Sequence, residues 1–168
     1  TEQARDAPIP APVRHVCLVT SVGSAAYHDM TQSLRERWPG LRVTVVDTAV
    51  QGGTAPAELV RALRRADALG ADAIVCGRGG GSAADLAAFD VEAVARAVAA
   101  CATPVVSAVG HESDWSVCDR VAAYRAKTPT AAIEFVVPRR ACELDADLRE
   151  RRAVVVRAVA AAVARAAA

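Results

Sequence analysis

The sequence lacks a long hydrophobic segment: no window reaches 18 uninterrupted apolar residues. A membrane-spanning helix needs about 20 such residues, so no membrane contact is predicted. The first twelve residues are polar, include Pro8, Pro10 and Pro12, and have no apolar signal core. Secretion is therefore not indicated, and a cytoplasmic protein is expected.

Neither sign of charge is in large excess, because 20 Lys and Arg face 19 Asp and Glu, for a net charge of +1. This balance excludes a protein that coats nucleic acid through overall positive charge, but it allows a local basic cleft. Composition also excludes disorder for most of the chain, since 53% of its 168 residues are hydrophobic. That length fits one domain with a substantial core.

Metal-binding patterns are missing too. There is no HExxH motif, no CxxC pair and no Cys/His cluster with ligand spacing, so no metal site is predicted. We expect no cofactor to be required, while a divalent cation such as Mg²⁺ stays compatible with the sequence. Most of the five cysteines lie in apolar runs and are expected to be small, reduced core residues. They are Cys17, Cys76, Cys101, Cys118 and Cys142.

What the sequence does contain is an alternation of short apolar runs with helical patterns. Strands are predicted over 15–20, 41–47, 72–76 and 104–109. Helices are predicted over 24–38, 54–69, 83–101 (broken), 115–125 and from Thr128 onward. This alternation predicts an α/β fold, with a mainly parallel sheet flanked by helices. In such sheets, functional residues collect at the carboxyl edge.

The helix predicted over 54–69 has the clearest amphipathic pattern. Thr54 is its expected N-cap and Gly70 its expected stop. Its buried face is expected to consist of Leu59, Leu63, Ala66 and Leu69.

Residues 139–168 differ in character, because they contain no glycine or proline and many Ala, Arg and Glu. They predict one long C-terminal helix with a partial apolar seam that includes Leu144, Leu148, Val155 and Val159. The helix ends without a stop signal, so we expect it to be cut from, or reduced from, a longer rod. The chain is thus divided into a flexible lead-in over 1–13, an α/β domain over 14–138 and a helix over 139–168.

The strongest local motif follows the third predicted strand and comprises Arg78, Gly79, Gly80, Gly81 and Ser82. Glycines let backbone N–H groups approach an anion, and an arginine adds a fork of donors that suits phosphate. The motif matches neither a P-loop nor a dinucleotide fingerprint. The alternative is a mobile turn with several positive φ angles. We favour phosphate binding.

A second motif follows the fourth predicted strand, where His111, Glu112 and Asp114 stand together. A histidine oriented by an acid can transfer a proton near neutral pH. The alternative is that Glu112 and Asp114 only cap the next helix. Both interpretations can hold together.

Three further polar residues are candidates on weaker grounds. Asp29 lies in the first helix, where an isolated acid is usually solvated. Thr128 and Thr130 could hold phosphate through their hydroxyls, but Thr-Pro is also an ordinary helix start.

Taken together, these motifs resemble the catalytic domain of the exonuclease VII large subunit. The matching segments are 50–52, 75–82, 85–86, 89–90, 104–114, 125–132 and Glu134, in the right order along residues 14–138. The resemblance implies a cytoplasmic nuclease that cuts single-stranded DNA from both ends into oligonucleotides, in some members without added divalent metal. It implies functional roles for Asp29, Arg78, His111 and Asp114.

The resemblance also implies an N-terminal OB-fold and a helical rod that binds several small subunits. We expect the OB-fold to be absent here and the rod to be reduced to residues 139–168. Family positions have drifted at Ser21-Val22-Gly23, His28, Ala84, Ala87 and Lys127. Two alternatives therefore stay open: an enzyme on a small phosphorylated or nucleotide-like substrate in a specialised pathway, and a non-catalytic assembly module that pairs through the 139–168 helix.

Overall fold

A computed structural model describes residues 8–79, 83–109 and 115–166 of the chain. The chain divides into two compact units, Thr1–Pro138 and Arg139–Ala168. Residues 8–13 form neither helix nor strand. In the described residues, no helix is both long and apolar enough to cross a bilayer.

The first unit is built on a five-stranded sheet in the order β2-β1-β3-β4-β5, with every neighbouring pair parallel. The strands are β1 (His15–Thr20), β2 (Arg42–Asp47), β3 (Ala73–Gly77), β4 (Val105–Ala108) and β5 (Tyr124–Arg125). The parallel α/β prediction is confirmed, and the four predicted strands are correct within one residue at each end.

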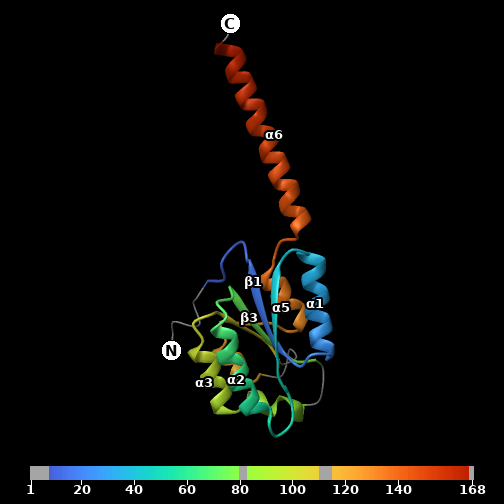
Figure 1. Cartoon of the computed structure of the whole chain (residues 1–168), viewed down its shortest axis with the longest axis vertical. Helices are drawn as coiled ribbons and strands as arrows, with labels where there is room; N and C mark the ends of the chain where they lie inside the picture. The colour runs from blue at the N-terminus through green and yellow to red at the C-terminus, as the bar shows by residue number, and fades with distance from the viewer. Residues whose placement is uncertain (1–7, 80–82, 110–114, 167–168) are drawn as a thin grey trace. The chain divides into compact units, whose positions relative to one another are not determined.

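Helices cover both faces of this sheet (Figure 1). They are α1 (Ala25–Arg37), α2 (Ala55–Asp67), the 3₁₀ helix η1 (Ala83–Phe89), α3 (Glu92–Ala100), α4 (Val117–Val121) and α5 (Pro129–Val136). The sheet's side chains alternate between two cores, as the two-residue period of a strand requires. In β1, Cys17 and Val19 pack with α2 and α3, while Val16 and Leu18 pack with α1 and α5.

Two predictions about helices are wrong. The helix expected over 115–125 is only α4, because the chain turns at Ala122 and β5 then joins β4, with Ala126 N–H donating to Ser107 O at 2.7 Å. Leu69 does not extend the buried face of α2: the helix ends at Asp67, Gly70 adopts φ +63°, and Leu69 is 39% exposed. Thr54 does hold the N-cap position, but its side chain makes no capping hydrogen bond.

The second unit contains the helix α6 (Ala141–Ala166), as the composition predicted. No residue of α6 is buried. Its high alanine content and the i,i+4 ion pair of Arg149 with Asp145 favour helix locally.

Candidate functional site

The strand order places a topological switch between β1 and β3. The chain goes from β1 outward to β2, then returns to the other side of β1 to form β3. Connections on either side of such a switch point leave in opposite directions, and the crevice at the carboxyl ends is where ligands bind in open α/β sheets. In this fold that crevice is bordered by the segments after β1 and β3.

Close packing joins these two segments. A Cβ atom on Gly79 would lie 3.3 Å from Cβ of Ala25 and 3.4 Å from the backbone nitrogen of Ala26, at the start of α1. A side chain at position 79 would require the start of α1 to shift by a few tenths of an ångström, so a glycine suits this close approach of the chain after β3. That N-terminus is capped by Ser24, whose hydroxyl accepts the Tyr27 N–H at 3.2 Å.

Gly77, at the end of β3, allows a similarly close approach between β3 and β4. Its Cβ would lie 3.3 Å from the carbonyl oxygen and 3.4 Å from the Cβ of Ala108 in β4. Neither Gly77 nor Gly79 has a positive φ. The first glycines of the segment therefore serve close backbone packing, a reason that differs from the turn geometry considered from the sequence.

Arg78 stands between these two glycines at the carboxyl edge. Its backbone N–H donates to Ala108 O at 3.3 Å, and the residue is only 4% exposed. A buried guanidinium needs charged or polar partners to offset its desolvation. The fold thus places Arg78 directly after β3, one of the two strands that border the switch point.

Several of the predicted site residues lie outside the described part of the chain: Gly80, Gly81, Ser82, His111, Glu112 and Asp114. Their neighbours are described. Gly79 and Ala83 flank the first group, and Val109 and Trp115 flank the second. Because Gly77 is paired with Ala108, both segments leave adjacent strands at the same edge.

The remaining candidates are not buried. Asp29 lies on α1, one turn beyond the residues that contact Gly79. Thr128 caps α5, its hydroxyl accepting the Ala131 N–H at 3.0 Å, and Thr130 is in the first turn of that helix. The helix-start interpretation of Thr-Pro is therefore correct for Thr128, whose exposure leaves it accessible from solvent.

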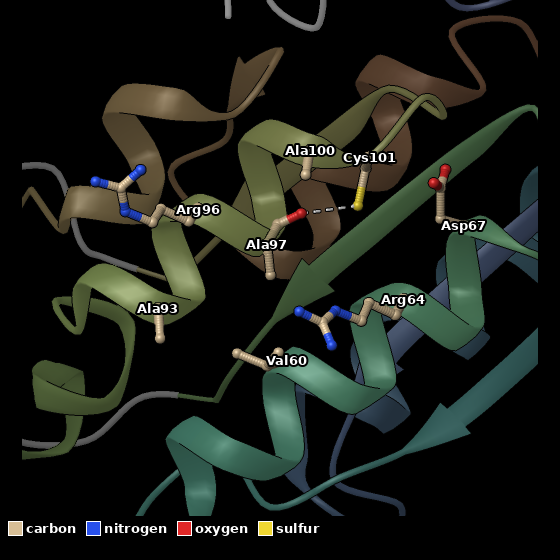
Figure 2. A pocket seen from close by; sticks show the side chains of 8 residues that line it. All are labelled: Val60, Arg64, Asp67, Ala93, Arg96, Ala97, Ala100 and Cys101. Carbon is tan, nitrogen blue, oxygen red and sulfur yellow. Dashed lines mark hydrogen bonds between the residues drawn. The ribbon is translucent and has the colours of Figure 1, made fainter.

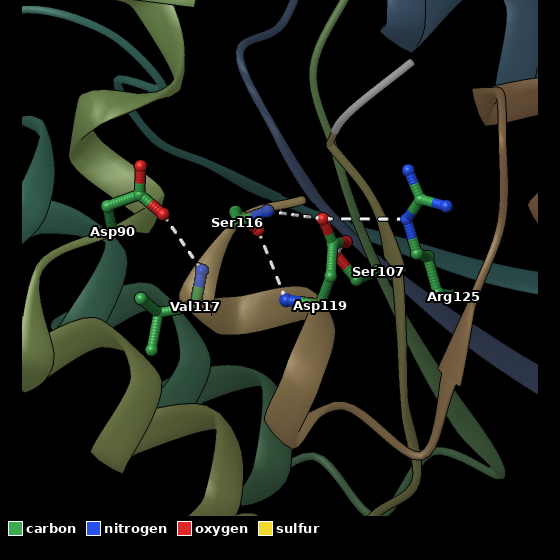
Figure 3. A network of polar contacts seen from close by, with 6 residues as sticks. All are labelled: Asp90, Ser107, Ser116, Val117, Asp119 and Arg125. Carbon is green, nitrogen blue, oxygen red and sulfur yellow. Dashed lines mark hydrogen bonds and ion pairs between the residues drawn. The ribbon is translucent and has the colours of Figure 1, made fainter. Parts of the chain in front are cut away.

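A buried polar network next to this edge escaped the sequence analysis (Figure 3). The carboxylate of Asp119 accepts the Ser107 hydroxyl at 2.6 Å and the Ser116 N–H at 2.9 Å, and it lies 3.7 Å from Nε of Arg125. The Asp119 side chain is fully buried. The sequence signal was the spacing Ser116-x-x-Asp119, which is a capping box.

This network holds the chain immediately after residues 110–114. Ser116 is the N-cap of α4, accepting the Asp119 N–H at 3.1 Å, so Ser116 holds the N-cap position that the alternative interpretation considered for Asp114. Asp90 adds a second anchor by accepting the Val117 N–H at 2.8 Å. On the other side of the segment, Val109 is buried. Val109 and the Ser116–Val117 pair are thus the described residues that border the histidine motif.

The thiol nearest the crevice is not a nucleophile. Cys76 is buried at the end of β3, and burial raises the pKa of its thiol well above the ordinary value. Burial likewise raises the pKa of Cys17 to about 11 and that of Cys118 to about 12. These cysteines are core residues, as predicted.

A cavity of about 380 Å³ lies elsewhere, between α2 and α3 (Figure 2). Two of its polar residues have structural roles: Asp67 accepts the Thr103 N–H at 2.8 Å, and Arg96 pairs with Glu92 at 2.7 Å. Cys101 donates to Ala97 O at 3.2 Å. The cavity includes the C-terminal ends of α2 and α3, which precede β3 and β4, and so lies toward the amino edge of the sheet rather than at the switch point.

Across the described ranges, no group of three or more His, Cys, Asp or Glu side chains is placed to hold a metal ion. The described chemistry at the carboxyl edge consists instead of Arg78, the glycine backbone and the polar residues of α1 and α5. Such a set can bind an anion and present it to groups on the adjoining segments.

Comparison with known proteins identifies the family of the chain. The family described as "Exonuclease VII, large subunit" matches residues 1–168. A protein of Pseudomonas aeruginosa named "Exodeoxyribonuclease 7 large subunit" is 53% identical over 134 residues, which are 80% of this chain and 29% of that protein. Proteins of the same name from Azotobacter vinelandii and Pseudomonas fluorescens are 52% and 50% identical, with the same coverage.

The chain thus spans about 29% of the length of these curated relatives. A solved "phosphate-loop protein" covers 64% of this chain, with 84% of its own length aligned, at a TM-score of 0.37 and 15% identity. That likeness is too weak to inform fold or function. The match over the whole chain is decisive: the chain belongs to the exonuclease VII large-subunit family.

Proposed function

We propose that residues 14–138 form a phosphodiester-hydrolysing domain that degrades single-stranded DNA to oligonucleotides in the cytoplasm. Family membership supports the reaction class. The observation that carries the proposal is the crevice itself, where Gly79 packs on the N-terminus of α1 and Arg78 stands beside it. A positive charge, a helix N-terminus and glycine backbone at one switch point favour a phosphate ligand.

In this proposal, Arg78 and the backbone N–H groups of Gly79, Gly80 and Gly81 bind the scissile phosphate, with the Ser82 hydroxyl as a further donor. These groups stabilise the negative charge that grows on the phosphoryl oxygens in the transition state. Thr128 and Thr130, at the start of α5, contact a neighbouring phosphate of the same strand.

Proton transfer is assigned to His111, as the general base toward water or the general acid toward the leaving oxygen. Asp114 and Asp29 orient the imidazole or the water. The anchors at Ser116 and Val117, shortly after residues 110–114, support this assignment, because a proton-transfer group must be held in place relative to the phosphate. No metal or other cofactor is required in this scheme.

The test is incubation of the purified chain with end-labelled single-stranded DNA, with and without EDTA. We expect shortening that survives EDTA and falls at least about 100-fold in the His111→Ala variant. The matched control is His28→Ala. His28 is exposed on α1, and this variant should cleave DNA as well as the unsubstituted chain does. Cleavage that persists in His111→Ala would remove this residue from the mechanism.

A folded protein that leaves DNA intact but hydrolyses a small phosphodiester would instead favour the small-substrate enzyme. If EDTA stops cleavage and Mg²⁺ restores it, the metal-free scheme is wrong and the phosphodiesterase proposal stands.

We further propose that α6 contacts another protein helix, either in a second copy of the chain or in a small helical subunit. Its apolar residues support this, because all of the following are more than half exposed: Leu148, Val154, Val155, Val156, Val159 and Val163. Light scattering at rising concentration should show self-association that is lost in Val155→Glu. A strict monomer would exclude the second copy as the partner.

A further inference from the structure

One large aromatic side chain near the carboxyl edge has no role in the proposed chemistry. Trp115 follows the histidine motif directly and is 54% exposed. An exposed indole at a loop end loses the favourable burial that a tryptophan ordinarily gains. The position of Trp115 and the side chains that contact it indicate its role.

The Trp115 indole packs on a side chain that is itself held in place by other residues. The guanidinium carbon of Arg125 lies 4.2 Å from the centroid of the Trp115 ring, within the range of a cation–π contact. The Arg125 side chain is only 12% exposed and pairs with the fully buried Asp119. Asp119 is in turn hydrogen-bonded to Ser107 on β4. Three residues from three elements thus support one ring that remains open to solvent.

The register of the β-strands places these supporting side chains next to the proposed phosphate site. Cys76 of β3 pairs with Ser107 of β4, and Ser107 pairs with Arg125 of β5. Neighbouring strands are about 4.8 Å apart, so Arg125 is about 10 Å across the sheet from β3, whose end leads to Arg78. A single-stranded DNA whose phosphate is bound at Arg78 therefore has a nucleobase, one or two nucleotides away, within reach of the Trp115 indole.

We propose that Trp115 is the stacking platform for a base of the single strand whose phosphate is bound at Arg78. This inference rests on the proposed function and adds a positioning residue to it. Stacking on an aromatic ring is largely independent of base identity, which suits an enzyme that must degrade any sequence. Arg120, whose guanidinium lies 5.7 Å from the same ring, adds positive charge on the exposed side of α4.

The other exposed aromatic pair is a poorer candidate. Tyr124 and Phe135 stack on each other, with ring centroids 3.5 Å apart and planes only 3° from parallel. Each ring therefore packs on a partner that is itself exposed, since Tyr124 is 40% and Phe135 is 42% exposed. Trp115 instead stacks on a cation that the buried Asp119 holds in place.

The experiment uses the whole chain with His111→Ala, to keep the DNA intact, and Trp38→Phe, to leave Trp115 as the only tryptophan. Its fluorescence is followed during titration with a dT oligonucleotide of about 12 nucleotides and with an abasic oligonucleotide of equal length. The two ligands carry the same phosphates and differ only in their bases. We expect quenching by dT and none by the abasic strand.

Affinity provides the second measurement, by anisotropy of labelled oligonucleotides. Trp115→Ala should weaken dT binding by about 5- to 100-fold and abasic binding by less than about 2-fold. Trp115→Phe, which keeps a ring, should recover most of the dT affinity, and the Trp38→Phe change alone should alter neither. Circular dichroism confirms that each variant is folded.

The outcomes separate the two proposals. Unchanged dT affinity in a folded Trp115→Ala variant, or equal weakening for dT and abasic strands, overturns the stacking role and leaves the nuclease proposal intact. If the parent chain binds neither strand, the proposed function fails, and the platform fails with it.

Discussion

The two units of this chain show two different ways in which a sequence specifies a helix. In the α/β unit, helices are held by apolar faces that pack on a sheet, as Leu59 and Leu63 of α2 are, both fully buried. In the second unit, α6 runs for 26 residues with none buried. The first kind of helix depends on its neighbours, whereas the second depends on alanine-rich composition and local ion pairs.

This difference determines how strongly a substitution in each unit affects the free energy of unfolding. A substitution in the α/β unit disturbs contacts that several elements share, and so it affects the free energy of unfolding of the whole unit. The same kind of substitution in α6 removes only exposed surface. Matched pairs of substitutions, one in each unit, can therefore sharpen or break the comparison.

Thiol reactivity should show the largest contrast. Four cysteines are buried in the α/β unit, and burial raises the pKa of Cys101 to about 12, while Cys142 on α6 is exposed. Because the thiolate is the reacting form, Cys142 should react with a disulfide reagent at pH 8 at least about 100-fold faster than the other four. We expect one fast thiol in the native protein and five in guanidinium chloride. Two or more fast native thiols would show that the α/β core opens.

Breaking a buried ion pair should cost more than breaking an exposed one. Asp119→Ala removes the partner of Ser107 and Arg125 in the interior and should lower the free energy of unfolding by about 3–5 kcal/mol. Asp147→Ala removes the exposed Arg139–Asp147 pair and should cost about 0–1 kcal/mol. Urea unfolding of both variants measures the contrast. Equal losses would mean that Asp119 does not anchor the start of α4.

Leucine truncation tests the apolar side of the same comparison. Leu63→Ala should lower the free energy of unfolding by about 2–5 kcal/mol, because it leaves a cavity between α2 and the sheet. Leu148→Ala on α6, at 59% exposure, should change it by less than about 0.5 kcal/mol. Urea midpoints at several protein concentrations provide the check. A large, concentration-dependent loss in Leu148→Ala would show that α6 is buried in an oligomer.

The sequence was sufficient to predict the strands and the parallel sheet, because strands buried on both faces are continuous apolar runs, such as 73–76. It was insufficient for β5, whose two residues carry no apolar period and are fixed by pairing with β4. It also suggested the wrong end for α2, since Leu69 continues the helical spacing while the carboxylate of Asp67 is occupied with the Ala102 and Thr103 amides.

The candidate site, like the fold, was predictable from the sequence only in part. Its position after β3 and β4 follows from the rule that function collects at the carboxyl edge, and Arg78 stands there. The strand order that makes β1 and β3 neighbours was not predictable from local pattern, and neither was the contact of Gly79 with Ala25. Asp119 was overlooked because an acid two positions into a short helix has the local pattern of a solvated residue, and only the pairing of β4 with β5 buries it.

The last effect we predict is a gain in stability. Thr20 ends β1 beside the switch point, is fully buried, and its hydroxyl has no hydrogen-bond partner among the described residues. An unpaired buried hydroxyl costs free energy that an apolar group of similar shape does not, so Thr20→Val should raise the free energy of unfolding by about 1 kcal/mol. Ser107→Ala, which deletes a hydroxyl that donates to Asp119, should lower it by about 1–3 kcal/mol. Urea unfolding distinguishes the two signs; a loss in Thr20→Val would mean that this hydroxyl does bond to a partner in solution, such as a water molecule at the crevice.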